Sequence, residues 1–219
     1  EAHCISDWGH DFRPDYRRIA DVLASLGSEV RVLAATATAN RRVEHDVAAQ
    51  IGTATRTFRG SLDRASLHLS VVELRSSAEQ LAWLASWTAA RPGPGLVYCL
   101  TVSEAERVAA YLADHGVAAA SYTGSTPAPE RERIEAGLGD GSLACVVATS
   151  ALGMGYDNPE LAYVVHLGSP SSPIAYYQQV GRAGRGAVDA EVVLLPTVAE
   201  ERIWAYFDAT AMPPEAAVT

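Results

Sequence analysis

The sequence predicts an α/β fold built on a parallel β-sheet. Short apolar runs alternate with stretches of helical periodicity along most of the 219 residues, which is the pattern of βαβ units. Hydrophobic residues make up 48% of the chain and charged residues 20%, as in ordinary globular proteins. The strand–helix steps that follow Ser61 are enough for one doubly wound domain, whereas the first 55 residues are too few for a second complete one.

The first part of the chain predicts one strand and one helix. Residues 31–35 are an apolar run that we interpret as a buried strand, and residues 41–51 have the periodicity of a helix. Residues 53–59 show no strong periodicity, so we interpret them as a connector to the second part.

The second part predicts alternating strands and helices. The alternation over 67–74 and the later apolar runs indicate strands at residues 67–74, 96–100, 118–122, 144–148, 162–167 and 190–195. Apolar faces at helical spacing indicate helices at residues 78–89, 103–115, 129–138, 173–180 and 198–207. His166, within a predicted strand, and the helical tryptophans are expected in the core: Trp83, Trp87 and Trp204.

The basic residues exclude one kind of nucleotide site. All 17 are arginine, so the chain contains no lysine and cannot form a GxxxxGK[ST] phosphate loop. The net charge of −9 falls on residues 61–219, which carry 9 arginines against 18 acidic residues. A globally basic nucleic-acid surface is therefore absent, and any such contact must be local.

Other compositional features indicate the cellular setting. No apolar run approaches the roughly 20 residues of a membrane span, and no signal peptide is visible. The odd number of cysteines (Cys4, Cys99 and Cys145) fits neither a zinc spacing nor a disulfide framework, which favours a reducing compartment.

Two arginines near the C-terminus stand among glycines. Residues 178–185 read Gln-Gln-Val-Gly-Arg-Ala-Gly-Arg, with Arg182 and Arg185 three positions apart. A guanidinium offers a rigid fork of donors that suits phosphate oxygens, and glycine allows close backbone approach. We interpret this segment as a phosphate-binding element.

A second glycine-containing segment follows the predicted strand at 144–148. Residues 148–159 read Ala-Thr-Ser-Ala-Leu-Gly-Met-Gly-Tyr-Asp-Asn-Pro. Backbone amides at such glycines can face phosphates. Taken alone the segment is a generic turn, but its place before residues 178–185 gives it weight.

The N-terminal segments combine acidic, aromatic and hydroxyl residues. Glu1-Ala2-His3 precedes a stretch over 4–16 that contains Trp8, His10, Phe12 and Arg13. Aromatic faces suit stacked bases, and the interleaved cations suit phosphates. Residues 35–39 read Ala-Thr-Ala-Thr-Ala, and their hydroxyls can contact phosphates or cap the next helix.

Together these segments resemble the RecQ-like branch of the superfamily 2 DNA helicases, from residue 1 to about 207. Residues 1–3 resemble the end of the DEAH box, 4–16 the aromatic-rich loop, 35–39 motif III, 97–101 motif IV, 148–159 motif V and 176–185 motif VI. The resemblance implies two RecA-like lobes with ATP in the cleft between them. It divides the chain into the end of the first lobe (1–55), a second RecA-like lobe (56–210) and a flexible tail (211–219).

The resemblance also assigns roles to individual residues. Those expected to take part in ATP hydrolysis are Glu1, Gln178, Arg182 and Arg185, with Arg185 as the arginine finger. Those expected to bind ATP are His3, Gly155, Asp157, Arg182 and Arg185. Those expected to bind DNA or to couple it to hydrolysis are Trp8, His10, Phe12, Arg13, Thr36, Thr38, Thr101, Thr149 and Gly153.

Several assignments have a structural alternative. Trp8 and Phe12 suit a core, and the hydroxyls of motifs III and IV suit helix caps. Arg64 lies in a segment that resembles the entry to the second lobe, where it could form an interdomain salt bridge or contact a ligand. Arg131 either corresponds to the arginine that the family has on this helix or lies on an exposed surface. Leu152, Asn158 and Gln179 depart from the family pattern without removing the arginine pair.

The resemblance implies part of an ATP-dependent helicase or translocase that moves 3′ to 5′ on DNA. ATP and Mg²⁺ are the expected cofactors, and the first DEAH carboxylate and the phosphate-loop lysine are missing, so this chain alone is expected to be inactive. No zinc site and no membrane contact are expected. The expected partners are single-stranded and 3′-tailed duplex DNA, and the resemblance is compatible with a monomeric protein. It is also compatible with a bacterial protein located in the cytoplasm, at the nucleoid. An RNA-directed member of the superfamily and a non-catalytic scaffold are the alternatives.

Overall fold

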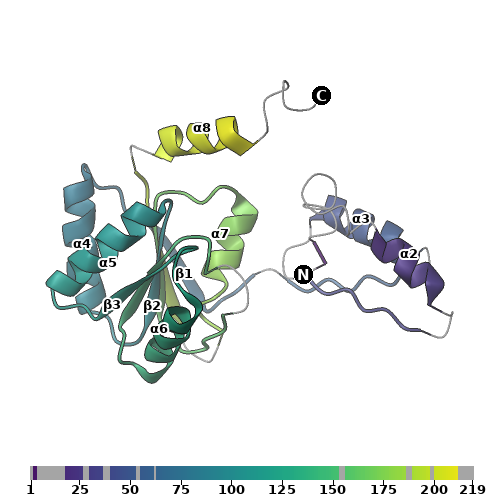
Figure 1. The fold of residues 1–219 in the computed structure, drawn as a ribbon, viewed down its shortest axis with the longest axis horizontal. Helices are drawn as coiled ribbons and strands as arrows, with labels where there is room; N and C mark the ends of the chain where they lie inside the picture. The colour runs from purple at the N-terminus through teal and green to yellow at the C-terminus, as the bar shows by residue number, and fades with distance from the viewer. Residues whose placement is uncertain are drawn as a thin grey trace. The chain divides into compact units, whose positions relative to one another are not determined.

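A computed structural model describes residues 2–3, 18–26, 30–36, 40–52, 55–61, 63–152, 156–185, 189–197 and 200–211. The chain forms two compact units, Glu1–Asp63 and Arg64–Thr219 (Figure 1). The second unit contains the sheet and most of the predicted motifs, and we describe each unit separately.

A six-stranded parallel sheet forms the centre of the second unit. Its strands are β1 (Leu67–Val71), β2 (Gly95–Cys99), β3 (Ala119–Tyr122), β4 (Cys145–Ala148), β5 (Tyr163–Leu167) and β6 (Ala190–Leu195). They lie in the order β1-β6-β5-β2-β4-β3, and every neighbouring pair is parallel. This confirms the predicted α/β class.

Helices cover both faces of this sheet (Figure 1). On one face α4 (Ser77–Ala89) and α5 (Val102–Asp114) pack through residues such as Leu84 and Val108. On the other, α6 (Ala128–Asp140) and α7 (Pro173–Val180) pack through Ile134 and Val180. Because both faces are covered, the central strands β2, β4 and β5 are buried at every position rather than alternately.

Three helices in this unit begin at a hydroxyl cap. The side chains of Ser76, Thr101 and Ser172 accept hydrogen bonds from the backbone amides of Glu79, Glu104 and Ala175 at the starts of α4, α5 and α7. Such caps satisfy amides that the first turn of a helix leaves unpaired. They fix where each helix begins after its strand.

The predictions for the buried aromatic residues are confirmed in part. His166 is 1% exposed, and Trp83 and Trp87 pack against the α4 and α5 side of the core. Trp83 and Trp87 are only partly buried there, and Trp204 is likewise half-buried on α8 (Glu200–Ala211), where its indole N–H donates to the Ser169 carbonyl. None of the helices in the described ranges has the length and apolar character needed to cross a bilayer.

The first unit contains two described helices, α2 (Arg18–Ser25) and α3 (Arg41–Ile51). The helix predicted over 41–51 is confirmed, and α2 was not predicted. The buried strand predicted over 31–35 is wrong, because residues 30–36 form no strand and Leu33 is 91% exposed. An apolar run indicates burial only where the fold supplies a partner surface.

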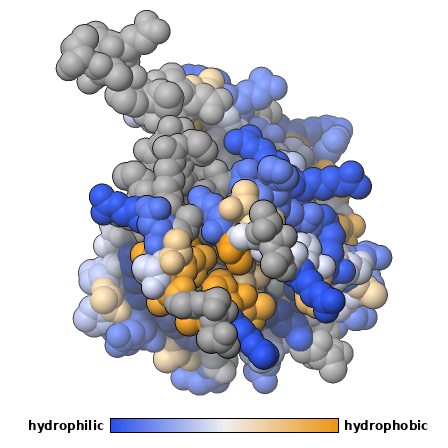
Figure 2. Space-filling model, turned by 90° about the vertical axis from the view of Figure 1, so that its right-hand side faces the viewer, coloured by the Kyte–Doolittle hydropathy of each residue, from blue (hydrophilic) through white to orange (hydrophobic). Residues whose placement is uncertain are grey.

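Large hydrophobic side chains in this first unit are exposed: Val22, Leu26, Val30, Val32, Leu33 and Phe58. Hydrophobic residues also gather in one patch on the face of the molecule drawn in Figure 2. Apolar surface gathered in this way is unusual for a free surface of a soluble domain.

Candidate phosphate-binding site

The segments that resemble motifs IV and V lie at the carboxyl edge of the parallel sheet, together with the predicted core residue His166 and the start of α7. Thr101 follows β2, Thr149 follows β4, His166 lies near the end of β5, and α7 leads from that edge into the arginine loop. The carboxyl ends of parallel strands are where open α/β sheets bind ligands. The topology thus brings together residues that are far apart in sequence.

The loop over 181–185 requires glycine at two positions. A Cβ on Gly181 would lie 2.9 Å from the Tyr177 carbonyl oxygen. Gly184 has φ +63°, and a Cβ there would lie 2.8 Å from a Leu67 methyl carbon and 2.9 Å from Ser66 Oγ. The glycines therefore allow a tight turn that packs against the start of β1.

Arg64 holds this loop through its carbonyl groups. Its Nη1 donates to Gly181 O at 2.9 Å, and its Nη2 donates to Gly184 O at 2.8 Å and to Ala183 O at 3.3 Å. Ser66 Oγ also donates to Gly184 O at 2.8 Å. Arg64 thus contacts the backbone of the motif VI segment. The sequence had suggested an interdomain salt bridge or a ligand contact for this residue.

Arg185 lies at the solvent-facing side of the loop, next to a predicted ATP contact. Its Nη1 is 2.8 Å from Asp157 Oδ1, and its Nε donates to Gly181 O at 2.9 Å. The side chains of Arg185 and Asp157 are 39% and 68% exposed. The guanidinium is thus both oriented and accessible to a ligand.

Arg182 is buried, in contrast to Arg185. It is 6% exposed, and its Nη1 donates to Tyr156 O at 2.7 Å. Burial raises the pKa of the nearby Tyr98 hydroxyl to about 12, against the lowering effect of the Arg182 charge. The two arginines that the sequence pairs therefore have different surroundings.

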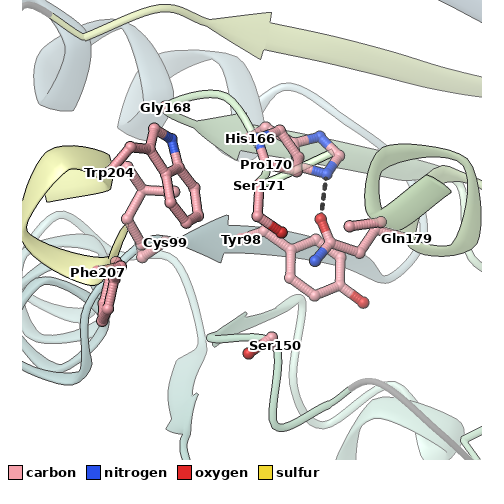
Figure 3. A pocket seen from close by; sticks show the side chains of 12 residues that line it. Tyr98, Cys99, Ser150, His166, Gly168, Pro170, Ser171, Gln179, Trp204 and Phe207 are labelled. Carbon is pink, nitrogen blue, oxygen red and sulfur yellow. Dashed lines mark hydrogen bonds between the residues drawn. The ribbon is translucent and has the colours of Figure 1, made fainter. Parts of the chain in front are cut away.

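His166 connects β5 to α7. Its Nε2 lies 2.9 Å from Gln179 Oε1, and since an amide oxygen only accepts, the ring donates from Nε2 (Figure 3). Burial lowers the pKa of His166 to about 4, so the ring is neutral at physiological pH. Its Nδ1 is buried and has no hydrogen-bond partner among the residues described.

A pocket of about 270 Å³ opens beside these residues. Tyr98 and His166 lie at the ends of neighbouring strands, and Trp204 and Phe207 of α8 line the opposite side (Figure 3). Ser150 of motif V also borders the pocket.

The remaining described site residues have structural contacts. Thr101 caps α5, as its alternative interpretation predicted, and Thr149 Oγ1 accepts from Ala151 N at 3.4 Å. Arg131 donates to the carbonyls of Thr123, Gly124 and Thr126 and thereby holds the loop before α6. Gln178 lies half-buried in α7.

In the first unit the structure joins the DEAH-like and motif III-like segments. His3 Nδ1 lies 2.9 Å from Thr36 Oγ1. The cap of α3 is Asn40, whose Oδ1 accepts from Val43 N at 2.9 Å. The cap interpretation of the motif III threonines is therefore wrong.

Several predicted site residues lie outside the described residues: Glu1, Trp8, His10, Phe12, Arg13, Thr38, Gly153 and Gly155.

The described part of the chain offers no group of three or more histidine, cysteine, aspartate or glutamate side chains that could hold a metal ion. The chemistry that these residues support is recognition of an anionic ligand by Arg185.

Sequence reasoning missed the roles of Arg64 and Tyr98. Arg64 contacts Gly184 across 120 positions, and Tyr98 contacts Leu152 across 54. Local spacing gives no signal for such pairs. The only available sign was their place inside segments that resemble family motifs.

Comparison with known proteins identifies the family. Residues 77–187 match the helicase conserved C-terminal domain. The chain belongs to this family. It is also 36% identical to the ATP-dependent DNA helicase RecQ of Pasteurella multocida over 195 residues, which cover 89% of this chain and 30% of that protein. The resemblance to RecQ-like superfamily 2 helicases is confirmed, and the chain spans less than a third of that relative's length.

Solved helicase structures share this fold. The Mycobacterium smegmatis helicase Lhr, bound to single-stranded DNA and AMP-PNP, superimposes with a TM-score of 0.54 at 25% identity over 59% of this chain and 19% of its own. Saccharomyces cerevisiae Dbp5, bound to RNA and ADP BeF3, gives a TM-score of 0.76 at 17% identity over 95% of this chain and 55% of its own. The Dbp5 likeness concerns the fold alone.

Proposed function

We propose that this chain is part of an ATP-dependent DNA helicase that couples ATP hydrolysis to 3′-to-5′ movement on single-stranded DNA and to duplex unwinding. The observation that carries the proposal is the pair Arg185–Asp157, an oriented and accessible guanidinium on a glycine loop. The RecQ relative and the nucleotide- and DNA-bound Lhr structure support ATP and DNA as ligands.

Arg185 is the arginine finger in this proposal. Stabilising charge that develops on the transferred phosphoryl group raises turnover by orders of magnitude. The contacts of its guanidinium with Gly181 O and Asp157, which hold the group at the loop surface, support this role. When a phosphate takes the place of the Asp157 carboxylate as the partner of Arg185, the guanidinium exchanges one anionic acceptor for another.

The phosphate-loop lysine must come from a part of the protein outside this chain, since the chain has no lysine. We propose residues 1–55 as the end of the first RecA-like lobe, 56–210 as the second lobe and 211–219 as a flexible tail. On this proposal the chain alone does not hydrolyse ATP. Mg²⁺ would be bound together with ATP, through ligands beyond the described residues.

The parent protein would act on single-stranded and 3′-tailed duplex DNA. Contacts would be local, through Thr149 and the other motif residues, because the second part of the chain is acidic. Since RecQ relatives include bacterial proteins, we propose a cytoplasmic site of action at the nucleoid.

The test is steady-state ATP hydrolysis by the full-length protein, with and without single-stranded DNA. We expect DNA to stimulate hydrolysis and Arg185→Ala to abolish the stimulated turnover, with DNA affinity nearly unchanged. Arg75→Ala, which changes an exposed arginine elsewhere in the same unit, is the matched control. Unchanged turnover of Arg185→Ala would exclude the finger assignment.

Two further comparisons test the alternatives. Replacing DNA by RNA of the same sequence distinguishes an RNA-directed protein, which RNA would stimulate more. Trp8→Ala should weaken DNA stimulation more than basal hydrolysis. No hydrolysis under any condition would instead indicate a non-catalytic scaffold.

A further inference from the structure

A buried tyrosine, Tyr98 on β2, touches the segments that resemble motifs V and VI. It is 3% exposed, and its hydroxyl donates to Leu152 O at 3.2 Å. A hydroxyl that is buried without a hydrogen-bond partner would destabilise the fold. The carbonyl that it contacts belongs to the last described residue before 153–155.

Arg182 makes the matching contact on the other side of residues 153–155. Its Nη1 donates to Tyr156 O at 2.7 Å, and its guanidinium lies near enough to the Tyr98 hydroxyl to lower the pKa of that group. Leu152 and Tyr156 are the described residues that flank 153–155. The Tyr98 hydroxyl therefore ties Leu152 to β2, and the Arg182 guanidinium ties Tyr156 to the arginine loop.

The ring of Tyr98 contributes a second connection, to α7. It stacks on His166 with ring centroids 5.3 Å apart and an interplanar angle of 17°. His166 in turn lies 5.1 Å from the Tyr176 ring and hydrogen-bonds Gln179. Tyr176 and Gln179 belong to α7, the helix that leads into Arg182.

We propose that Tyr98 is a positioning residue that transmits displacement of residues 149–157 to Arg182 and α7. This role rests on the proposed function, because those residues include predicted DNA contacts and the arginine loop includes the predicted finger. Since packed cores switch between discrete arrangements rather than deform smoothly, a buried hydrogen bond on one side of Tyr98 and a ring stack on the other are a suitable connection. Tyr98 acts through Arg182 and does not itself touch ATP or DNA.

The test variant is Tyr98→Phe in the full-length protein, because it removes only the hydroxyl and keeps the ring against His166. We expect DNA-stimulated ATP turnover to fall about tenfold, more than turnover without DNA, since the buried hydrogen bond between the Tyr98 hydroxyl and Leu152 O is lost. We also expect faster amide hydrogen exchange within residues 149–157 and 182–185.

Tyr163→Phe is the matched control. Tyr163 is a buried tyrosine on the neighbouring strand β5, and its hydroxyl donates to a backbone carbonyl, Ala144 O, at 3.1 Å. It packs in the core cluster on the α4 and α5 side. We expect a comparable loss of thermal stability in both variants, but DNA-stimulated turnover within about twofold of wild type for Tyr163→Phe alone.

Combining Tyr98→Phe with Arg182→Lys separates positioning from a general loss of stability. If Tyr98 acts through Arg182, the double variant should lose little more stimulated turnover than Arg182→Lys alone. Fully additive losses, or equal losses for Tyr98→Phe and Tyr163→Phe, would overturn the proposal.

The exchange measurement distinguishes this proposal from the proposed function. A wild-type protein without DNA-stimulated hydrolysis would refute the proposed function, whereas unchanged exchange in Tyr98→Phe would refute the Tyr98 connection. Faster exchange confined to 149–157 and 182–185 supports the connection in either case.

Discussion

The guanidinium of Arg64 donates to the carbonyl of Gly184 at 2.8 Å, across 120 positions of sequence. With its bonds to the carbonyls of Gly181 and Ala183, this side chain holds the backbone that carries Arg182 and Arg185. An arginine fork can serve several acceptors at once, which the single ammonium of lysine does less well.

Removing this fork should destabilise the second unit. We expect Arg64→Met to lower the free energy of unfolding by about 2 kcal/mol, because half-buried carbonyls lose a charged donor. Urea denaturation measures the change. Arg75→Met, at an exposed position, should stay within about 0.5 kcal/mol of wild type; an equal effect of both substitutions would contradict the structural role of Arg64.

Gly184→Ala should cost more than the same change at Gly141. Both glycines have positive φ, +63° and +79°, but a Cβ at Gly184 meets Leu67 and Ser66, whereas one at Gly141 meets open space. We expect about 1 kcal/mol of backbone strain at Gly141 and at least about 1 kcal/mol more at Gly184 from overpacking. Thermal unfolding of the two variants provides the comparison. Equal melting temperatures would show that the loop accommodates the methyl group at position 184 without an additional loss of stability.

Asp157→Asn should leave stability almost unchanged. The ion pair with Arg185 is substantially exposed, so its loss should change the free energy of unfolding by less than about 0.5 kcal/mol. A clear change in ATP turnover at unchanged stability would then report on the site itself. A loss of more than about 1 kcal/mol in urea denaturation would instead mark the pair as structural.

His166 should make stability depend on pH. Burial lowers its pKa from 6.5 to about 4 in the folded protein. Below pH 6.5 the unfolded chain therefore binds a proton that the folded protein does not, and stability is lost as the pH falls from 6.5 towards 4. The contribution at pH 5 should be a loss of about 2 kcal/mol relative to pH 7.

The measurement is chemical denaturation of wild type and His166→Gln between pH 7 and pH 5. The variant keeps an amide donor but cannot titrate. The carboxylates give both proteins the same pH dependence of the free energy of unfolding, so that contribution cancels in the difference between them. A difference that does not change with pH would show that the unfolded and folded pKa values of His166 are similar.

The two described cysteines should resist thiol reagents in the folded state. Cys145 is fully buried, and burial raises its pKa to about 12; burial also raises the pKa of Cys99. Since the thiolate is the reactive form, labelling at pH 8 should require unfolding. A Cys4→Ser background isolates these two thiols, and rapid labelling of the native protein would contradict the prediction.

Much of the second unit could be predicted from its sequence. The helix at 173–180 and the strand at 190–195 match α7 and β6, because their apolar periods and flanking Gly and Pro residues are local signals. Burial on both faces of the sheet reinforces the same local preferences, so sequence and fold agree.

The first unit and the connections within the site were less predictable. The apolar run at 31–35 has the composition of a strand, but residues 30–36 pair with no strand, and Leu33 is exposed. Whether Arg182 is buried or open depends on Tyr98 and Tyr156, which tertiary structure brings to it. Sequence spacing identified both arginines and could not distinguish their surroundings.

The pairing of β1 with β6 determines how short a self-standing version of the second unit can be. Both strands lie outside the family match at 77–187, yet β6 pairs with β5 and β1 pairs with β6 at the edge of the sheet. A polypeptide trimmed to the matched stretch would expose a bare strand edge that invites aggregation, and it would also lack Arg64. Expression boundaries for biophysical work should therefore enclose at least residues 64–195.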